Sequence, residues 1–406
     1  MKKPETNKLI QVSTDVIKDC SLENGAIVAA NSDKSIYPSA VQDYRYVWIR
    51  DASYICIAAD ILGLRDIPER FFDWCLHRAE GFRETGLFHN AYNVNGTIHG
   101  TLVPPTKPKI PQRVRDRYVH LIQHGTQFQP DQGGSLLVAI GHHIKHFGIR
   151  KISGYKKLMQ RTASGISKSW KNGQFVLPCF DLWEERCLLP TQKRYHTYSL
   201  AMCIAGLRVA IDLLEKKKDW LRTEKEMSEV FSELYSCHPN LIPRTYSSGS
   251  RNQCDKWGKE DFLPDASLLG LVYPSAIIEA LDKKMKRTVN KIIDKNTIDH
   301  GGLLRYPQDR YCGGVKNGWV ALTGAGAWPL LSFWMAVYFS MRGDEKNARK
   351  YFNWPLERID QYIPEQIFKD NLLRQCESTA RKKLSIRPLA WSHAMFIIAA
   401  DFLGYL

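Results

Sequence analysis

Several kinds of segment are missing from this chain of 406 residues. No apolar run approaches the roughly 20 residues of a transmembrane helix, which argues against a membrane partner. The ten cysteines include no C-x-x-C pair, so we expect no structural zinc, no other metal and no cofactor. The basic start, Met1–Asn7, leads into mixed polar sequence without the apolar core of a signal peptide, which predicts a cytoplasmic protein.

Period-two alternation, internal repeats and linkers are also scarce. Few runs alternate apolar and polar residues as a half-buried strand would, and no repeat is strong enough to indicate a solenoid. No linker separates two domains, so we expect a single domain. A chain of this length buries roughly 75% of its unfolded surface, which allows a sizeable core.

Positive charge, by contrast, is abundant, with a formal net charge of +15. Such an excess could serve an anionic partner. The lysines are spread over predicted helix faces, for example at residues 215–218 and 282–295, and the common nucleic-acid-binding signatures are absent. We therefore interpret the excess as solvated surface and expect no nucleic-acid partner, while the oligomeric state stays open.

Helical periodicity recurs along most of the chain and predicts an all-α fold. Periodicity alone leaves a bundle, a solenoid and a closed toroid open. Two long irregular stretches, residues 85–117 and 238–262, interrupt the pattern, and loops of that length are usually functional or mobile. The predicted helices cover residues 7–20, 50–63, 69–84, 131–147, 153–171, 196–216, 219–237, 265–282, 284–294, 324–341, 345–361 and 391–403.

The segment DLWEER, residues 181–186, sets two adjacent carboxylates directly after a tryptophan. Neighbouring acids repel each other, so at least one has a reason to hold its proton. An isolated Glu-Glu pair is most often a solvated helix face. Here Trp183 is placed to shield Glu184, so we expect a raised pKa for Glu184 and an ionised Glu185.

The segment YRYVWIRD supplies Tyr44, Trp48, Arg50 and Asp51 just ahead of a predicted helix. Aromatic rings stack on sugar faces, and charged groups hydrogen-bond vicinal hydroxyls with directional selectivity. Taken alone, the segment fits a helix start with a capping acid equally well. In the segment FQPDQGG, we expect Asp131 to cap the helix that follows.

Two later segments add further polar candidates. The sequence RYPQDRY contains Arg305 and Tyr311 and leads to Trp319, although such a loop alone is more often a simple turn. We expect Asp309 to tie this loop together. The sequence YIPEQI contains Glu365, and a Pro-Glu pair between helices is by itself usually structural.

Taken in their order along the chain, the five segments resemble the motifs of glucoamylase-type inverting glycosidases, glycoside hydrolase family 15, from about Tyr44 to Trp391. The resemblance implies an (α/α)6 toroid with its active site at one end of the inner helices. Fungal members carry a tryptophan upstream of PQ-x-DG where this chain reads QHG, so contacts to a second sugar do not follow. Prokaryotic members often carry a preceding β-sandwich domain; we expect only the catalytic domain here, over residues 1–406.

The resemblance also implies residue roles. Glu184 would be the general acid and Glu365 the general base, which an inverting enzyme needs on the opposite face of the sugar, about 6.5–9.5 Å away, to leave room for water. Arg50, Asp51 and Arg305 would hold the terminal glucose. The other substrate-binding candidates are Tyr44 near the water, Trp48 supporting the acid, Glu185 at the leaving sugar, and Trp183, Tyr311 and Trp319.

The expected activity is hydrolysis of a terminal α-linked glucose from the non-reducing end of an oligo- or disaccharide, a small-molecule carbohydrate. α-1,4-glucans, α-1,6-linked isomaltose and trehalose all remain open, because the motifs describe mainly the first sugar site. A non-catalytic carbohydrate-binding or regulatory protein is disfavoured because both carboxylates are present. A phosphorylase of a related fold would need phosphate. An anionic sugar would suit the basic residues Lys107, Lys109, Arg113, Arg115, Arg244 and Arg251.

Overall fold

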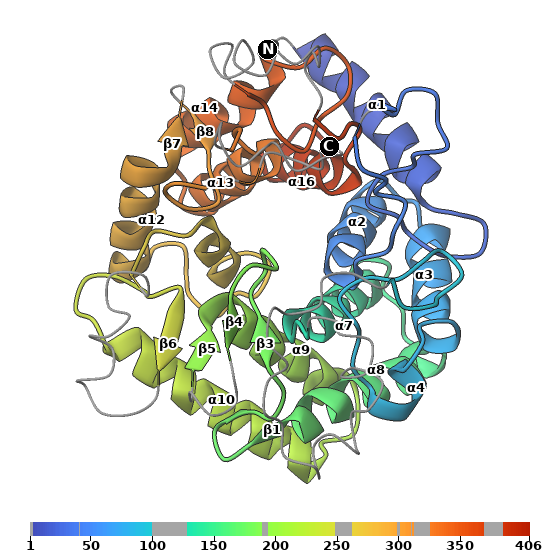
Figure 1. Cartoon of the computed structure of the whole chain (residues 1–406), viewed down its shortest axis with the longest axis vertical. Helices are drawn as coiled ribbons and strands as arrows, with labels where there is room; N and C mark the ends of the chain where they lie inside the picture. The colour runs from blue at the N-terminus through green and yellow to red at the C-terminus, as the bar shows by residue number, and fades with distance from the viewer. Residues whose placement is uncertain are drawn as a thin grey trace.

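The computed structural model describes residues 3–39, 41–99, 128–188, 194–247, 262–298, 301–309, 311, 325–368 and 385–406. Its helices form a double ring, and the chain runs once around it from the N-terminus to the C-terminus (Figure 1). The outer ring contains α1 (Lys3–Cys20), α3 (Asp66–His77), α8 (Ser153–Ser169), α10 (Lys218–Ser236), α12 (Lys283–Asn296) and α14 (Glu345–Leu356).

The inner ring alternates with the outer one along the chain and closes on itself. It contains α2 (Ile49–Ile61), α7 (Asp131–His146), α9 (Thr197–Leu213), the 3-10 helix η3 (Ala266–Leu271), α13 (Pro329–Met341) and α16 (Ala390–Phe402). Each of these contacts the next in this order, and α16 contacts α2 again. The all-α prediction and the α/α toroid are therefore confirmed.

Inner and outer helices differ in sequence for a physical reason. The inner helix α13 is buried at every residue from Pro329 to Phe339, because it packs against neighbours on all sides. The outer helix α12 instead buries Met285, Val289 and Ile292 at helical spacing and turns its lysines mostly outward. The excess of positive charge on α12 is thus solvated surface, as predicted.

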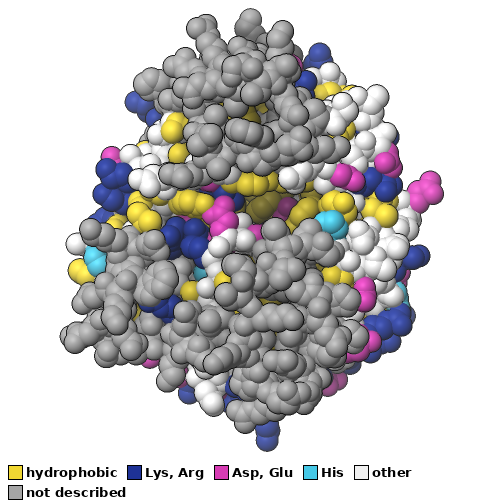
Figure 2. Space-filling model, viewed as in Figure 1, with side chains coloured by type: hydrophobic (Ala, Val, Ile, Leu, Met, Phe, Trp, Pro, Cys, Tyr) yellow, Lys and Arg dark blue, Asp and Glu magenta, His cyan; other side chains and the backbone are white. Residues whose placement is uncertain are grey.

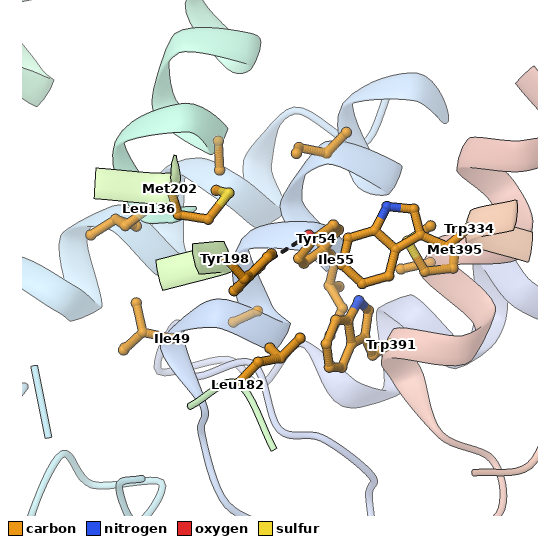
Figure 3. Close-up of a cluster of buried hydrophobic side chains, with 14 of the residues drawn as sticks. Ile49, Tyr54, Ile55, Leu136, Leu182, Tyr198, Met202, Trp334, Trp391 and Met395 are labelled. Atoms are coloured by element: carbon orange, nitrogen blue, oxygen red, sulfur yellow. Dashed lines mark hydrogen bonds between the residues drawn. The ribbon is translucent and has the colours of Figure 1, made fainter. Parts of the chain in front are cut away.

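Aromatic side chains from four inner helices fill the middle of the ring (Figure 3). Tyr54 of α2 donates or accepts a hydrogen bond of 3.2 Å with the hydroxyl of Tyr198 of α9. The ring of Tyr54 also packs against Trp334 of α13 and Trp391 of α16, with centroids 5.7 and 5.2 Å apart. The centre of the toroid at this level is therefore a packed core.

Strands are few and short in the described part of the chain, and each pairs with one antiparallel partner. The pairing of Phe180 with Cys187 makes residues 181–186 the turn of a hairpin. The pairs are β1 (Trp170–Lys171) with β2 (Gln174–Phe175), β3 (Cys179–Phe180) with β4 (Cys187–Leu188), β5 (Arg194–His196) with β6 (Thr245–Ser247), and β7 (Thr297–Ile298) with β8 (Gly302–Leu303).

Three predicted helices differ from those observed. The helix predicted over 265–282 is only η3 followed by turns, and Pro274 cannot donate a backbone hydrogen bond there. The helix predicted over 69–84 is two helices, α3 and α4 (Phe82–Thr85), separated at Gly81 with a φ of 77°. The helix predicted over 345–361 ends at Leu356, directly after Pro355.

Two further predictions from the sequence can be compared with the described residues only in part. Much of the two irregular stretches, at residues 100–117 and 248–261, lies outside them. Within the described ranges, no helix combines the length and the apolar character needed to cross a membrane. The prediction of a single domain stays a prediction.

Candidate active site

The N-terminal ends of three inner helices surround one cavity of about 240 Å³. Trp48 precedes α2, Trp328 precedes α13, and Trp391 is the second residue of α16. Helix N-termini carry partial positive charge and favour nearby carboxylates. Figure 2 shows a hollow near the centre of this face, bordered by hydrophobic and acidic side chains.

The cavity brings together nearly all of the predicted site residues. Leu182 and Trp391, at the edge of the aromatic cluster in Figure 3, line it as well, so the packed centre of the toroid lies beneath it. Trp319 lies outside the described residues. The predicted residues that line the cavity are Tyr44, Trp48, Arg50, Asp51, Trp183, Glu184, Glu185, Arg305, Tyr311 and Glu365.

The hairpin turn between β3 and β4 presents Glu184 to the cavity. The Oδ1 atom of Asp181 accepts hydrogen bonds from the backbone N–H groups of Glu185 (2.9 Å) and Arg186 (3.0 Å), which closes the turn. Glu184 itself has a φ of 64°, in the left-handed region. A non-glycine residue there costs about 1–3 kcal/mol, and such strain is concentrated at functional sites.

Both carboxylate oxygens of Glu184 accept hydrogen bonds. The indole Nε1 of Trp48 donates to Oε1 at 2.8 Å, and the amide Nδ2 of Asn90 donates to Oε2 at 3.1 Å. Burial raises the pKa of Glu184, while Arg50 and these two donors act in the opposite direction. Asn90 belongs to no recognisable motif, so no sequence pattern indicated this contact.

The environment of the Glu-Glu pair differs from the sequence prediction in one respect, the pKa of Glu185. Trp183 lines the cavity with Glu184 and donates its Nε1 to Asp265 at 2.9 Å, and Trp48 donates to Glu184, as the resemblance implied. Burial raises the pKa of Glu185 as well, although Arg305 and the Tyr306 hydroxyl oppose the shift. The raised pKa of Glu184 agrees with the prediction, whereas the raised pKa of Glu185 was not predicted.

Glu365 is almost completely buried, with 3% of its surface exposed. Its backbone N–H donates to the carbonyl of Ile386 at 2.8 Å, and His393 Nε2 accepts from the N–H of Ile363 at 3.0 Å. Burial raises the pKa of Glu365 to about 8, against the effects of Arg305 and a hydrogen bond from Tyr44. Its Oε2 atom has no hydrogen-bond partner among the described residues.

Arg50 is held at the cavity by three oxygen acceptors. Its guanidinium donates to Gln129 (2.9 Å), Asp131 (3.3 Å) and Asp51 (3.2 Å). The prediction that Asp131 caps α7 is wrong: its side chain makes no cap hydrogen bond and accepts instead from Ser199 and Arg50. Burial raises the pKa of Asp51 to about 6, opposed by Arg50.

Arg305 is held from the other side of the cavity by a two-pronged contact. Its Nε and Nη2 atoms each donate to Asp309 at 2.7 Å, and the Tyr311 N–H donates to the same carboxylate at 3.0 Å. Asp309 therefore ties the loop together, as predicted. Nη2 of Arg305 also donates to Glu185 at 2.5 Å.

Two tryptophans that the sequence analysis did not identify as site residues also line the cavity. Trp328 and Trp391 are 6% and 5% exposed, and the indole Nε1 of each is buried without a hydrogen-bond partner in the described part of the chain. A signal was available for Trp328, because it precedes Pro329 at the start of α13 as Trp48 precedes α2. No grouping of His, Cys, Asp and Glu in the described ranges could hold a metal ion.

A double ring of helices whose cavity carries several carboxylates and aromatic rings has the architecture of a helical-toroid glycoside hydrolase. The family model described as glycosyl hydrolases family 15 matches residues 20–401. The chain therefore belongs to glycosyl hydrolases family 15. The resemblance that the sequence motifs indicated is confirmed.

Proteins of related sequence match most of this chain. An uncharacterized glycosyl hydrolase of Methanocaldococcus jannaschii is 32% identical, over 93% of this chain and 53% of the relative. The isomaltose glucohydrolase of Kribbella flavida is 24% identical, over 94% of this chain and 91% of the relative. A trehalase of Thermoplasma volcanium is 24% identical, over 78% and 46%. The chain spans about half the length of the first of these relatives.

Solved structures share the fold. A glycosidase in complex with glucose superposes with a TM-score of 0.72 at 19% identity, with both chains covered completely. A bacterial glucoamylase complexed with acarbose gives a TM-score of 0.67 at 16% identity, over 97% of this chain and 55% of that one. At these identities the likeness supports the toroid and not a particular substrate.

Proposed function

We propose that this hydrolase removes one α-linked glucose from the non-reducing end of a short oligosaccharide or disaccharide, with inversion at the anomeric carbon. The observation that carries the proposal is the meeting of Glu184 and Glu365, far apart in the sequence, in one small cavity. Two carboxyl groups on opposite sides of the scissile bond are what an inverting glycosidase requires.

The size and lining of the cavity suit one sugar ring. Its volume of about 240 Å³ is below the roughly 300 to 1,000 Å³ typical of sites for drug-sized ligands. Rings such as Trp48 and Trp391 offer stacking surfaces, while Arg50, Asp51 and Arg305 offer directional hydrogen bonds. A site of this size favours a terminal sugar over the interior of a polymer.

In the proposed reaction, the protonated Glu184 gives its proton to the glycosidic oxygen as the bond from that oxygen to C1 breaks. Ionised Glu365 removes a proton from water as the water oxygen bonds to C1 from the opposite face. The products are β-glucose and the shortened sugar, and both carboxyls then exchange protons with solvent. The position of Glu365 in the lining of the same cavity as Glu184 supports its role as the acceptor of the water proton.

Isomaltose is the first substrate to test. The relative named isomaltose glucohydrolase matches this chain over nearly the full length of both proteins. Trehalose is the second, because several trehalases match, although over about half of their own length. Glu185 is the candidate contact for the leaving sugar, because Arg305 fixes its carboxylate at the cavity.

An anionic sugar finds less support than the sequence suggested. Arg244, one of the basic residues that prompted the idea, is 8% exposed and lies 3.7 Å from the carboxylate of Asp265. Arg186 is paired with the same carboxylate at 2.7 Å and also with Asp181. These charges balance one another. The other basic residues of that group lie outside the described ranges.

The deciding experiment is NMR of the first anomer released from maltose, isomaltose and trehalose. We expect β-glucose from one α-linked substrate, with Glu184→Gln and Glu365→Gln reducing turnover while the fold is retained. With maltose or isomaltose, α-glucose as the first product of the attacked sugar would contradict inversion. With trehalose, inversion gives one α- and one β-glucose, so α-glucose alone would contradict it. Binding without any product would favour a non-catalytic role, and dependence on phosphate would favour a phosphorylase.

A further inference from the structure

The contact between Asn90 and Glu184 has no counterpart among the residues that the motifs identified. Asn90 is 3% exposed and lies in the segment between α4 and α7. Its Nδ2 donates to Oε2 of Glu184 at 3.1 Å, while its own Oδ1 is buried without a partner among the described residues. A buried unsatisfied acceptor destabilises a fold and calls for an explanation.

The two donors to Glu184 are locked to each other through the backbone. Val47, just before Trp48, and Tyr92, two residues after Asn90, exchange hydrogen bonds of 2.8 and 2.9 Å. These bonds pair the two segments in an antiparallel bridge. Trp48 and Asn90 therefore approach Glu184 as parts of one unit.

A second tie runs through the buried side chain of Gln132 in α7. Its Oε1 accepts from the N–H of Ile49 at 2.9 Å, and its Nε2 donates to the carbonyl of Asn90 at 2.9 Å. The amide of Gln132 thus joins the start of α2 to the Asn90 backbone. The hydrogen bond from Gln132 fixes the backbone of Asn90 without using its side chain. The side-chain Nδ2 therefore remains available to donate to Glu184.

We propose that Asn90 is a positioning residue of this hydrolase, whose amide orients Glu184 and stabilises the carboxylate that remains once the proton has passed to the leaving oxygen. The inference rests on the proposed role of Glu184 as general acid. A donor to that carboxylate gains strength as negative charge develops on it, so it acts more on the transition state than on the ground state. Burial of Asn90 keeps water from replacing the donor.

This role makes a specific demand on the leaving group. A sugar alcohol is a poor leaving group and needs its proton during bond cleavage, whereas fluoride leaves with little help from an acid. Loss of the Asn90 donor should therefore slow disaccharide hydrolysis and spare hydrolysis of α-glucosyl fluoride. A structural role would reduce both rates together, because water attack and glucose binding are common to both substrates.

The test compares kcat on the best disaccharide with kcat on α-glucosyl fluoride for Asn90→Leu. We expect a loss of about 10- to 100-fold on the disaccharide, in line with a hydrogen bond to a charged group, and about threefold or less on the fluoride. Asn90→Asp keeps the shape and places a second carboxyl beside Glu184, so it should lose at least as much on the disaccharide. Asn90→Asp can also replace Asn90→Leu in this test if the leucine variant does not fold.

The matched control is Asn93→Leu in the same segment. Asn93 donates to Thr97 at 2.9 Å and makes no contact with Glu184, so its loss should change both rates by the same factor. Equal losses on both substrates for Asn90→Leu and Asn90→Asp, or no loss on either, would overturn the proposal.

Glu184→Gln, measured in the same way, separates this proposal from the one on which it rests. If Glu184→Gln loses disaccharide turnover selectively and the Asn90 variants do not, only the role of Asn90 fails. If Glu184→Gln also shows no selectivity for the fluoride, the assignment of Glu184 as the acid fails.

Discussion

The two carboxyl groups of the cavity are held in opposite ways. Glu184 sits on a hairpin turn with strained backbone, and both of its oxygens accept hydrogen bonds from side chains. Glu365 sits in a segment fixed through its backbone, and one of its oxygens has no partner in the described part of the chain. The side-chain donors therefore stabilise the negative charge of Glu184, whereas the backbone hydrogen bond at Glu365 fixes the position of that residue.

This difference fits the two roles proposed for them. A general acid becomes an anion during bond cleavage, so donors placed on both oxygens stabilise the product of its proton transfer. A general base must keep an oxygen open for the water that it deprotonates, so protein donors on that oxygen would compete with the water. The two roles can therefore be told apart by the hydrogen bonds to each carboxyl group.

The largest expected effect is the loss of turnover on removing either carboxyl. Glu184→Gln and Glu365→Gln should each reduce kcat on a disaccharide by about 10²- to 10⁴-fold, the usual contribution of acid–base groups. With α-glucosyl fluoride the two should separate: Glu184→Gln recovers much of its activity, while Glu365→Gln does not, because water still needs a base. Recovery by both variants, or by neither, would remove the distinction.

A second effect concerns stability, because burial raises the pKa of both carboxyls. The pKa of Glu365 is raised by burial to about 8, so between its unfolded pKa, about 4.5, and 8 the folded state binds more protons than the unfolded state. Stability from this group is therefore full at low pH and is lost as the pH rises through that window. Glu365→Gln removes the titratable group and therefore also this loss of stability at high pH.

We expect Glu365→Gln to raise the free energy of unfolding at pH 8, relative to the original protein, by roughly 1–3 kcal/mol more than at pH 4.5. Glu184→Gln should show a smaller gain, because a glutamine cannot accept both donors that now satisfy the carboxylate. Urea denaturation at the two pH values measures both differences. Equal gains for the two variants would contradict the contrast drawn above.

The pH dependence of activity gives a third test. Hydrolysis needs one carboxyl protonated and the other ionised, so kcat/KM should follow a bell that falls where both are protonated and where both are ionised. Because the pKa values of both carboxyls are raised, the bell should lie above the ordinary carboxyl range. Tyr44→Phe removes a hydrogen bond that lowers the pKa of Glu365, so less of this proposed base is ionised at a given pH and the acid limb should move upward.

The relevant measurement is kcat/KM from pH 4 to 10 for the original protein and for Tyr44→Phe. A bell centred near the pKa of free carboxyls, about 4 to 4.5, would contradict the effect of burial. An unchanged acid limb in Tyr44→Phe would show that this limb does not report Glu365.

The sequence predicted the toroid only through its resemblance to a known family, since helical periodicity describes single helices and not ring closure. Outer helices such as α12 were predicted well, because one face is apolar and the other charged. The inner element η3 was predicted as part of a helix because most of its residues are apolar. Complete burial removes the periodicity that separates a helix from other buried segments.

The cavity residues divide along similar lines. Residues with distinctive types in recognisable motifs, such as Glu184, Glu365 and Arg305, were predicted to lie at the site, and the cavity contains them. Asn90 was missed because its importance comes from a contact across the fold and not from a local pattern. Asp131 was given the wrong partner because a cap is a local interaction, whereas its ion pair with Arg50 joins two helices.

The smallest effect should come from replacing Trp391, a tryptophan that lines the cavity. Trp391→Phe keeps an aromatic ring but removes an indole Nε1 that is buried without a protein partner in the described ranges. We expect the free protein to lose little hydrogen-bonding stability, while kcat/KM falls about three- to tenfold through the loss of one donor to the sugar. The Tm and kcat/KM of the purified variant measure the two effects.

The control is Trp334→Phe in the same aromatic cluster (Figure 3). Its Nε1 already donates to the carbonyl of Tyr273 at 2.7 Å and does not line the cavity, so this variant should lose stability and keep its kcat/KM. The two substitutions are chemically identical and differ only in what the indole donor faces. Loss of stability in Trp391→Phe with unchanged kcat/KM would place that indole in the packed core and remove it from the sugar site.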